Sequence, residues 1–301
     1  MLLRIYLITV FMVFGYFSSV WAGEELSWPD CLREAAKNHP ELIAAREEVI
    51  QQQAAKTITK STGLPQISTD LNVTTSRSTA SGASNAFNYG ISGSQLLFNG
   101  FKTVNNVKAA SENIKAAREN FRFTSVTLRL RLRTAFINLL KAQELLNLTQ
   151  EIYKIRKDNV ELISLRYQSG TEHQGALFTA QANLSQADYE INQARRGLET
   201  ARRQLMKELG RNEFSPIQVK ADFEVSHAVT EKPDFEALAQ KNPSFLKIIA
   251  QKNAAEFDAK ASIGDFWPTM SLTGGVSRSD SRWPPRERGS SAGVKVSLPL
   301  F

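Results

Sequence analysis

The chain has almost no cysteine, because Cys31 is the only one among 301 residues. A lone cysteine forms no disulfide within its own chain, so a disulfide-stapled fold is excluded. Cys31 lies on a predicted helix and lacks the leucine-rich run that precedes a lipid-bearing N-terminal cysteine. We therefore expect no lipid anchor.

Long apolar runs are also scarce. The single one, at residues 5–17, is shorter than the roughly 20 residues that a helix needs to cross a bilayer. It follows Arg4 and leads to the small residues that end at Ala22, so residues 1–22 are predicted to be a secretory signal peptide. Any later contact with a membrane must then use β-strands.

Clustered catalytic groups are missing as well. The three histidines, His39, His173 and His227, lie far apart in the sequence, and neither a nucleophile elbow nor a phosphate-binding loop is present. We predict no catalytic, cofactor or metal site, and hence no enzyme. The 37 basic and 30 acidic residues alternate along helical stretches, which is typical of solvated helices and argues against binding of nucleic acid.

The sequence instead contains a repeat. Pro40 matches Pro243, Pro65 matches Pro268 and Phe98 matches Phe301, each at an offset of 203. Two copies of one structural unit explain this spacing. The second copy stops at the equivalent of Phe98, so we expect it to be incomplete.

Each copy begins with a helix and continues as a hairpin of strands. Residues 28–59 carry apolar or small residues at intervals of seven, with a kink or break expected at Pro40. Residues 67–74 and 87–92 then alternate apolar and polar, around a predicted polar loop at 76–86. The second copy repeats this at 270–276 and 292–300, around a loop at 277–291.

Strands of this length with alternating faces and aromatic ends are typical of membrane barrels, although two soluble hairpins fit the strands equally well. Four strands cannot close a barrel, since closed membrane barrels start at about eight, and open sheet edges are not tolerated in lipid. A membrane location therefore requires an oligomer.

Residues 101–169 contain neither glycine nor proline, which predicts one helix of about 100 Å. The alternation of apolar and basic residues at 126–133 favours a strand locally, but no turn residue flanks it, so we predict a helix there too. After a turn at 168–171, a second helix runs to Leu209 and ends at Gly210.

This returning helix has a coiled-coil seam, with a row of large apolar residues from Leu177 to Leu205 and a row of alanines from Ala180 to Ala201. It is about half as long as the outgoing helix. The helix at 28–59 has the missing length, so we infer that two short helices stack end to end beside the long one.

This order of elements resembles the TolC family of outer-membrane efflux proteins. The resemblance extends from Leu26 to Phe301. It rests on local sequences at residues 35–40, 63–67, 97–100, 166–170 and 209–210.

The resemblance implies a mixed α/β membrane protein, in which a long antiparallel coiled-coil hairpin is joined to two β-hairpins of an oligomeric transmembrane β-barrel. It further implies a homotrimer in the outer membrane, in contact with its lipid and extending into the periplasm as a passive exit duct for small molecules or proteins. The expected partners are a periplasmic adaptor protein and an inner-membrane pump of an efflux or type I secretion system, and the hairpin tip would meet the adaptor. The tip residues are Arg166, Tyr167, Ser169, Gly170 and Leu177, of which Gly170 equally fits a purely structural role in the turn.

The polar side of the predicted strands contains Asp70, Asn72 and Lys295, which are candidates for facing the pore.

Two departures from the family stand out. Ala176 occupies a position that is often Asp in the family, so an acidic gating ring there is in doubt, and the second long hairpin should follow Phe301. We hypothesise a fragment or a prematurely ended reading frame.

Two alternatives stay open, a periplasmic adaptor or coiled-coil scaffold, and a non-functional remnant of a channel. The predicted organisation begins with a signal peptide (1–22). The first repeat contains a first periplasmic helix (23–62), a transmembrane hairpin (63–99) and a long helical hairpin (100–210, tip near 166–176). After a linker (211–233), the second repeat contains its own first helix (234–265) and a transmembrane hairpin (266–301).

Overall fold

The computed structural model describes residues 24–78, 82–221 and 233–300. The predicted signal peptide, His227 and Phe301 lie outside these residues. The described chain divides into two compact units. We call the part within Met1–Pro40 and Val126–Ala228 the helical unit, and the part within Glu41–Ser125 and Val229–Phe301 the sheet unit.

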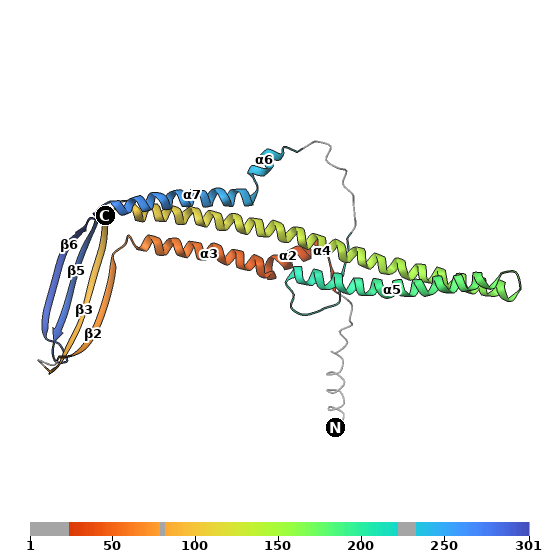
Figure 1. The fold of residues 1–301 in the computed structure, drawn as a ribbon, viewed down its shortest axis with the longest axis horizontal. Coiled ribbons are helices and arrows are strands. Elements are labelled where there is room, and N and C mark those ends of the chain that lie inside the picture. The colour runs from red at the N-terminus through yellow and green to blue at the C-terminus, as the bar shows by residue number, and fades with distance from the viewer. Residues whose placement is uncertain (1–23, 79–81, 222–232, 301) are drawn as a thin grey trace, which may run out of the picture. The chain divides into compact units, whose positions relative to one another are not determined.

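Helix α4 belongs to both units, because it runs unbroken from Lys102 to Gln168 (Figure 1). Its 67 residues correspond to about 100 Å, as the absence of glycine and proline predicts. The stretch at 126–133 is helical as well, since Leu128 and Leu132 are spaced by four and both are buried. Every second residue of the stretch is apolar, but only Leu128 and Leu132 are buried, whereas Val126 and Leu130 are exposed and Arg131 pairs with the buried Glu208.

The helical unit packs around a core at the C-terminal end of helix α5 (Gln174–Leu209). Besides α4 it contains β1 (Glu24–Leu26), α2 (Trp28–Asn38), α5 (Gln174–Leu209) and β4 (Ile217–Val219). Leu132, Leu139, Leu205, Leu209 and Ile217 are fully buried in this core. Trp28 adds an edge-on contact with Phe136, with ring centroids 5.7 Å apart.

Cys31 lies in the same core, where its side chain is fully buried. Burial, together with the negative charges of Glu34 and Asp30, raises the pKa of the Cys31 thiol to about 12. The thiol therefore stays protonated at neutral pH, and it serves as a small apolar side chain.

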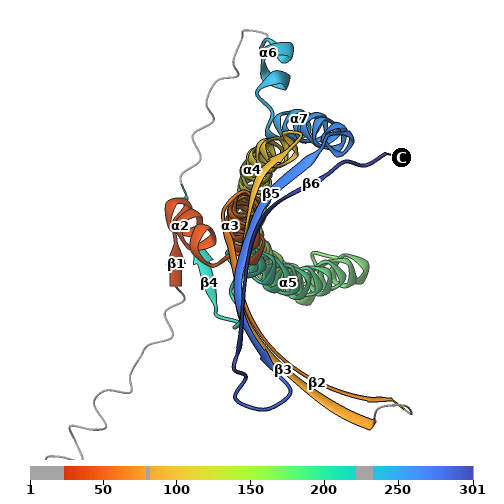
Figure 2. The same ribbon diagram turned by 90° about the vertical axis from the view of Figure 1, so that its left-hand side faces the viewer.

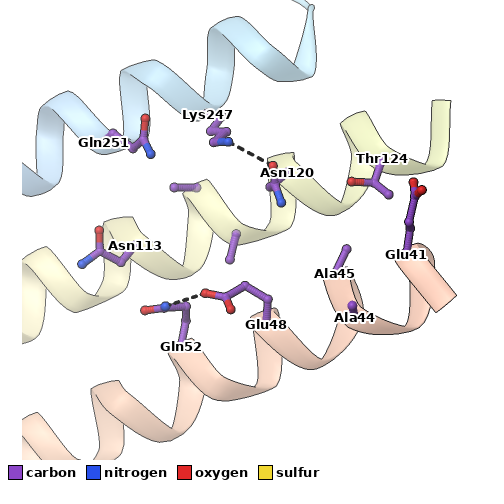
Figure 3. Close-up of a pocket in the computed structure, with 12 residues that line it drawn as sticks. Glu41, Ala44, Ala45, Glu48, Gln52, Asn113, Asn120, Thr124, Lys247 and Gln251 are labelled. Atoms are coloured by element: carbon purple, nitrogen blue, oxygen red, sulfur yellow. Dashed lines mark hydrogen bonds between the residues drawn. The ribbon is translucent and has the colours of Figure 1, made fainter. Parts of the chain in front are cut away.

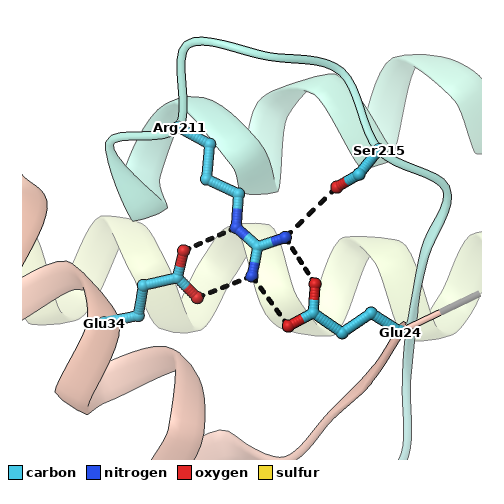
Figure 4. A network of polar contacts seen from close by, with 4 residues as sticks. All are labelled: Glu24, Glu34, Arg211 and Ser215. Atoms are coloured by element: carbon cyan, nitrogen blue, oxygen red, sulfur yellow. Dashed lines mark hydrogen bonds and ion pairs between the residues drawn. The ribbon is translucent and has the colours of Figure 1, made fainter.

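Arg211 ties three segments of the helical unit together (Figure 4). It follows α5 and donates to both oxygens of Glu34 on α2, at 2.5 and 2.8 Å, and to both oxygens of Glu24 on β1, at 2.6 and 3.1 Å. A further bond of 3.1 Å reaches the hydroxyl of Ser215. These bonds fix the start of the described chain against the end of the helical hairpin, where β1 and β4 pair in parallel.

The sheet unit contains one four-stranded antiparallel sheet, whose strands lie side by side in Figure 2. The strands are β2 (Gln66–Ser78), β3 (Gly82–Asn99), β5 (Thr269–Asp280) and β6 (Glu287–Ser297), in the spatial order β2-β3-β5-β6. Strands β2 and β6 are thus the two edges. The chain enters α4 from β3 through Gly100, whose φ is +63°, and a side chain there would meet the carbonyl oxygen of Gly264 at 2.6 Å.

The loops predicted at 76–86 and 277–291 were too long, because the strands extend into both of them. Described pairing continues to Ser78 and Gly82 in the first hairpin, and to Ser279 and Glu287 in the second. The polar residues were misleading because they bond across the strands, as do the hydroxyls of Ser76 and Ser84, which are 3.1 Å apart. A Ser- and Thr-rich segment is a strand when a neighbour satisfies its backbone.

Helices α3 (Pro40–Ser61), α6 (Phe235–Gln240) and α7 (Pro243–Ile263), with a short 3-10 turn (Gly264–Phe266), complete the sheet unit. The predicted single helix at 234–265 was wrong, because Asn242 caps a new helix whose first residue is Pro243. The segment predicted as a helix at 23–62 begins with strand β1, and the break expected at Pro40 is confirmed, since α2 ends at Asn38 and α3 begins at Pro40. The predicted linker at 211–233 contains strand β4.

Among the described residues, no helix combines the length and the apolar composition that crossing a bilayer requires.

We predict that Arg211→Met destabilises the helical unit by about 2–3 kcal/mol at neutral pH, since hydrogen bonds between charged groups are lost and Glu34 is left half-buried without them. Arg33→Met is the matched control. It removes an exposed pair with Asp30 on the same helix, and the expected change is much smaller than that of Arg211→Met, because water screens the pair. Urea unfolding followed by helical circular dichroism measures both.

The difference between wild type and Arg211→Met should depend on pH. The hydrogen bond from Arg211 lowers the pKa of Glu24 below its ordinary value of 4.5. The stabilisation from Glu24 is therefore present above that value and is lost as the pH falls through the lower folded-state pKa. Unfolding curves that stay equally separated well below pH 4.5 would contradict this account.

Candidate functional site: the sheet faces and the hairpin tip

The register of the sheet assigns every strand residue to one of two faces. Residues paired across neighbouring strands share a face, and successive residues along a strand alternate. Asp70, Gly90, Ser277 and Gly289 form one row. Thr69, Ile91, Val276 and Ser290 form the next row, on the opposite face.

One face is almost entirely polar, and we call it the polar face. It contains all three residues that the sequence suggested as pore-facing: Asp70, Asn72 and Lys295. Asp70 and Asn72 are neighbours on edge strand β2, whereas Lys295 lies on the other edge strand, β6, so the structure does not bring it into contact with them. All three side chains are exposed.

The other face, which we call the apolar face, is exposed although it is hydrophobic. Ile67 is 79% exposed, Val276 59% and Val294 60%. The apolar face also contains the following residues of the same kind: Leu71, Val73, Ile91, Met270, Leu272 and Val296. A contiguous exposed apolar surface of this extent marks a contact with another protein or with lipid.

Aromatic side chains lie at both ends of the apolar face. At the loop end, Trp283 contacts Phe87 and Tyr89, with centroids 6.0 and 6.4 Å apart. At the helix end, Phe98 contacts Phe101 at 5.6 Å, and Phe266 and Trp267 are exposed there as well. The apolar band is therefore flanked by aromatic rings on both sides.

The tip of the helical hairpin is a tight turn built on Gly170. The N–H of Thr171 donates to the carbonyl of Arg166 at 2.9 Å, and that of Gly170 to the carbonyl of Tyr167 at 3.0 Å. This is the Schellman arrangement, which requires the left-handed conformation that Gly170 adopts at φ +76°. His173 then caps α5, since its Nδ1 accepts the N–H of Ala176 at 3.0 Å.

The predicted tip residues lie together at this turn. Arg166, Tyr167, Ser169 and Gly170 are exposed, and Leu177 is half-buried one turn into α5. Apolar side chains surround them, with Leu165 59% and Phe178 57% exposed. Arg166 and Ser169 also shape the turn, because the Ser169 hydroxyl donates to the Arg166 carbonyl at 2.9 Å.

A groove of about 770 Å³ lies among α3, α4 and α7 in the sheet unit (Figure 3). Its floor is made of the buried alanines Ala45, Ala116 and Ala117. Its polar side chains bond to one another, as Gln52 does to Glu48 at 2.8 Å and Lys247 to Asn120 at 3.0 Å. The groove thus presents a polar surface to water. Among the described residues, no group of three or more potential ligands could hold a metal ion.

Comparison with known proteins identifies the family. The sequence pattern described as outer membrane efflux protein matches residues 31–211, more than half of the chain. The chain belongs to the outer membrane efflux protein family.

Individual family members agree with this assignment. The outer membrane efflux protein BepC of Brucella suis biovar 1 (strain 1330) is 26% identical over 275 residues, which cover 90% of this chain and 59% of BepC. Among solved structures, the CmeC outer membrane channel of Campylobacter jejuni has a TM-score of 0.78 at 18% identity, and the match covers 91% of this chain and 61% of the CmeC chain. CusC has a TM-score of 0.77 at 20% identity, and that match covers 90% of this chain and 65% of the CusC chain.

These likenesses establish the fold as that of outer-membrane channels of the efflux family. They also show that this chain spans about 59% of the length of BepC.

Sequence reasoning missed two features of this family member. The first is the bond network of Arg211, whose partners are distant in sequence. The second is the pair Arg278 and Arg288, which stand directly opposite each other on the apolar face. The alternation of strands could have placed each arginine on its face, but only the register shows that they are paired.

Three glycines of the helical unit give a graded prediction. At Gly170 an added Cβ has free space but a strained φ of +76°, so Gly170→Ala should cost about 1 kcal/mol. At Gly210 the φ is +78° and the Cβ would lie 2.6 Å from the carbonyl oxygen of Asn38, so Gly210→Ala should cost more than Gly170→Ala. Thermal unfolding measures both variants, and the unfolding temperature of Gly210→Ala should be the lower of the two.

Gly197 is the control for this series, because it lies inside α5, exposed and with nothing within 4 Å of an added Cβ. Gly197→Ala should stabilise the helix by about 0.5–1 kcal/mol. Equal losses at Gly170 and Gly210 would show that the close approach of Asn38 is absent in solution.

Proposed function

We propose that this chain is the outer-membrane channel subunit of an efflux or secretion assembly, and that it acts as a passive exit duct. The observation that carries the proposal is the sheet, with a polar face on one side and an exposed apolar face between two aromatic girdles on the other. Membrane strands present this pattern, with aromatic rings at the two interfaces and polar residues toward an aqueous interior.

The dimensions of the apolar face fit a bilayer. Tyr89 and Phe98, which belong to the two girdles, pair with Arg278 and Met270, which are eight positions apart on β5, because a bulge between Leu96 and Phe98 adds one residue to β3. That separation is about 27 Å along a strand, and a strand tilt of about 40° reduces it to about 21 Å across the membrane. The lipid-facing band of outer-membrane barrels is about 25 Å tall.

The open edges of the sheet require further copies. In the part of the chain that the structure describes, β2 and β6 each pair on one side only, and unpaired backbone groups cost several kcal/mol each in hydrocarbon. A homotrimer, in which three copies of the four-stranded sheet join edge to edge, would leave no edge unpaired. The polar face, with Asp70, Asn72 and Lys295, would then line the water-filled interior.

We further propose that the tip of the helical hairpin docks a periplasmic adaptor protein, which in turn connects the channel with an inner-membrane pump. The exposed apolar side chains Leu165, Tyr167 and Phe178 support this role, because exposed apolar residues at a loop tip suit a protein contact. Arg166 and Ser169 would add polar contacts, while Gly170 and Leu177 would hold the shape of the turn.

The membrane proposal is tested by two adjacent substitutions on β5. Leu272→Lys places a charge on the apolar face, two positions from the girdle at Met270, where it should cost less than the roughly 2–4 kcal/mol of the bilayer midplane but more than the roughly 0–1 kcal/mol of the interface. Thr273→Lys places the same charge on the polar face and should cost little. The measurement is the amount of assembled oligomer in the outer-membrane fraction, and equal recovery of the two variants would refute the assignment of faces.

The adaptor proposal is tested by photo-crosslinking in cells. A photoreactive phenylalanine analogue at Tyr167 should crosslink to another periplasmic protein, whereas the same analogue at Tyr189 should not. Tyr189 is the matched control, because it is an exposed tyrosine on the same hairpin, away from the tip. Identical crosslinks at both positions would contradict a docking site at the tip.

A further inference from the structure

Two arginines stand opposite each other on the apolar face of the sheet. Arg278 on β5 and Arg288 on β6 are cross-strand partners, in the same row as Leu71 and Tyr89. Directly opposed residues have Cβ atoms about 5 Å apart, and like charges on such a pair destabilise a sheet. An anion bound by both guanidinium groups would offset this repulsion.

The protein itself supplies no such anion among the described residues. Neither guanidinium has a described carboxylate within ion-pair distance. Asp280 lies on the same face, but its carboxylate accepts the backbone N–H groups of Arg282 and Arg286 at 3.3 and 3.4 Å. Glu287 lies on the polar face, because it immediately precedes Arg288 on the strand.

A hollow of about 600 Å³ lies beside the two arginines on the apolar face. The arginines line one part of it, and Ile91, Val276 and Ser290 of the next row line another. From there the apolar face continues along β5 to Met270. A ligand that fits this surface has an anionic head and an apolar tail.

The position of the arginine row agrees with a lipid headgroup. Arg278 is eight positions from Met270 on β5, which is about 27 Å along the strand and about 21 Å across a bilayer after tilt. The row therefore lies at the edge of the hydrocarbon band. Tyr89 and Trp283 are beside it, and aromatic rings of this kind sit at headgroup level.

We infer that Arg278 and Arg288 bind the phosphate of an anionic membrane lipid, whose acyl chains lie along the apolar face of β3, β5 and β6. The inference rests on the proposed function, since it requires that the apolar face contacts lipid. Guanidinium groups match phosphate well, because each can donate two parallel hydrogen bonds to its oxygens. The bound phosphate also relieves the repulsion between the two arginines.

The test uses the full chain, extracted from membranes in a neutral detergent, with phosphatidylglycerol as the anionic probe and phosphatidylcholine as the zwitterionic comparison. Native mass spectrometry counts the bound lipids, and thermal unfolding follows their effect on the midpoint. We compare wild type with Arg278→Gln/Arg288→Gln. The control Arg156→Gln/Arg195→Gln removes the same charge from exposed positions on the helical hairpin.

Wild type and the control should bind phosphatidylglycerol in preference to phosphatidylcholine. The Arg278→Gln/Arg288→Gln variant should bind it at least about tenfold more weakly, because charge-assisted hydrogen bonds are lost. Arg278→Lys/Arg288→Lys, which keeps the charge but not the paired donors, should fall between the two. Without lipid, the Gln variant should unfold at the same temperature as wild type or a higher one, since the repulsion is gone.

Equal binding of phosphatidylglycerol by wild type and by the Gln variant would overturn the inference, as would a Gln variant that is less stable without lipid. Inorganic phosphate that stabilises wild type as well as phosphatidylglycerol does would also overturn it, in favour of a free-anion site. The proposed function is tested separately, because it fails if the Leu272→Lys and Thr273→Lys oligomers are recovered in equal amounts. That result does not depend on the arginines.

Discussion

The unpaired edges of the four-stranded sheet are the constraint on which the interpretation of this protein depends. Every backbone N–H and C=O in a hydrocarbon layer needs a partner, and among the described residues β2 and β6 each pair on one side only. In lipid, such a sheet would have to be completed by other strands. The oligomer that we propose follows from hydrogen bonding and hydrophobic burial together.

The two faces of the sheet differ in polarity, and the alternation of the strands makes this possible with few residue types. Serine, threonine, glycine and asparagine predominate on the polar face, beside Asp70 and Lys295, and some of them bond to one another, as the hydroxyls of Ser68 and Ser92 do at 2.9 Å. Branched aliphatic residues predominate on the apolar face. Asp280 and the pair of Arg278 and Arg288 depart from this division, and all three lie at the loop end of the apolar face.

The helices combine two kinds of contact, because buried alanines accompany the large leucines of the core. Alanines are buried where α3 and α7 meet α4 in the sheet unit, and alanines line the buried side of α5 in the helical unit. Small residues let helix backbones approach closely and leave the longer polar side chains for water. The close approach of Gly210 to Asn38 and of Gly100 to Gly264 extends the same rule to the turns.

The sequence alone predicted much of this organisation. The lack of glycine and proline determined the single long helix, the intervals of seven in α5 predicted its buried rows, and the offset of 203 related Pro40 to Pro243, which both begin helices. The alternation of apolar and polar residues indicated that the strands have two faces. These features are local or periodic, so they can be seen without knowing which segments meet.

Only the tertiary structure decided how distant segments pair. The parallel pairing of β1 with β4, the bonds of Arg211 to Glu24 and Glu34, and the opposition of Arg278 and Arg288 depend on register and packing between segments that no local pattern relates. The extent of the hairpins belongs here too, because polar residues form strands only when a neighbouring strand satisfies their backbone. The sequence therefore determined the elements and their faces, and the structure determined the partners, since partner choice is set by contacts between residues far apart in the chain.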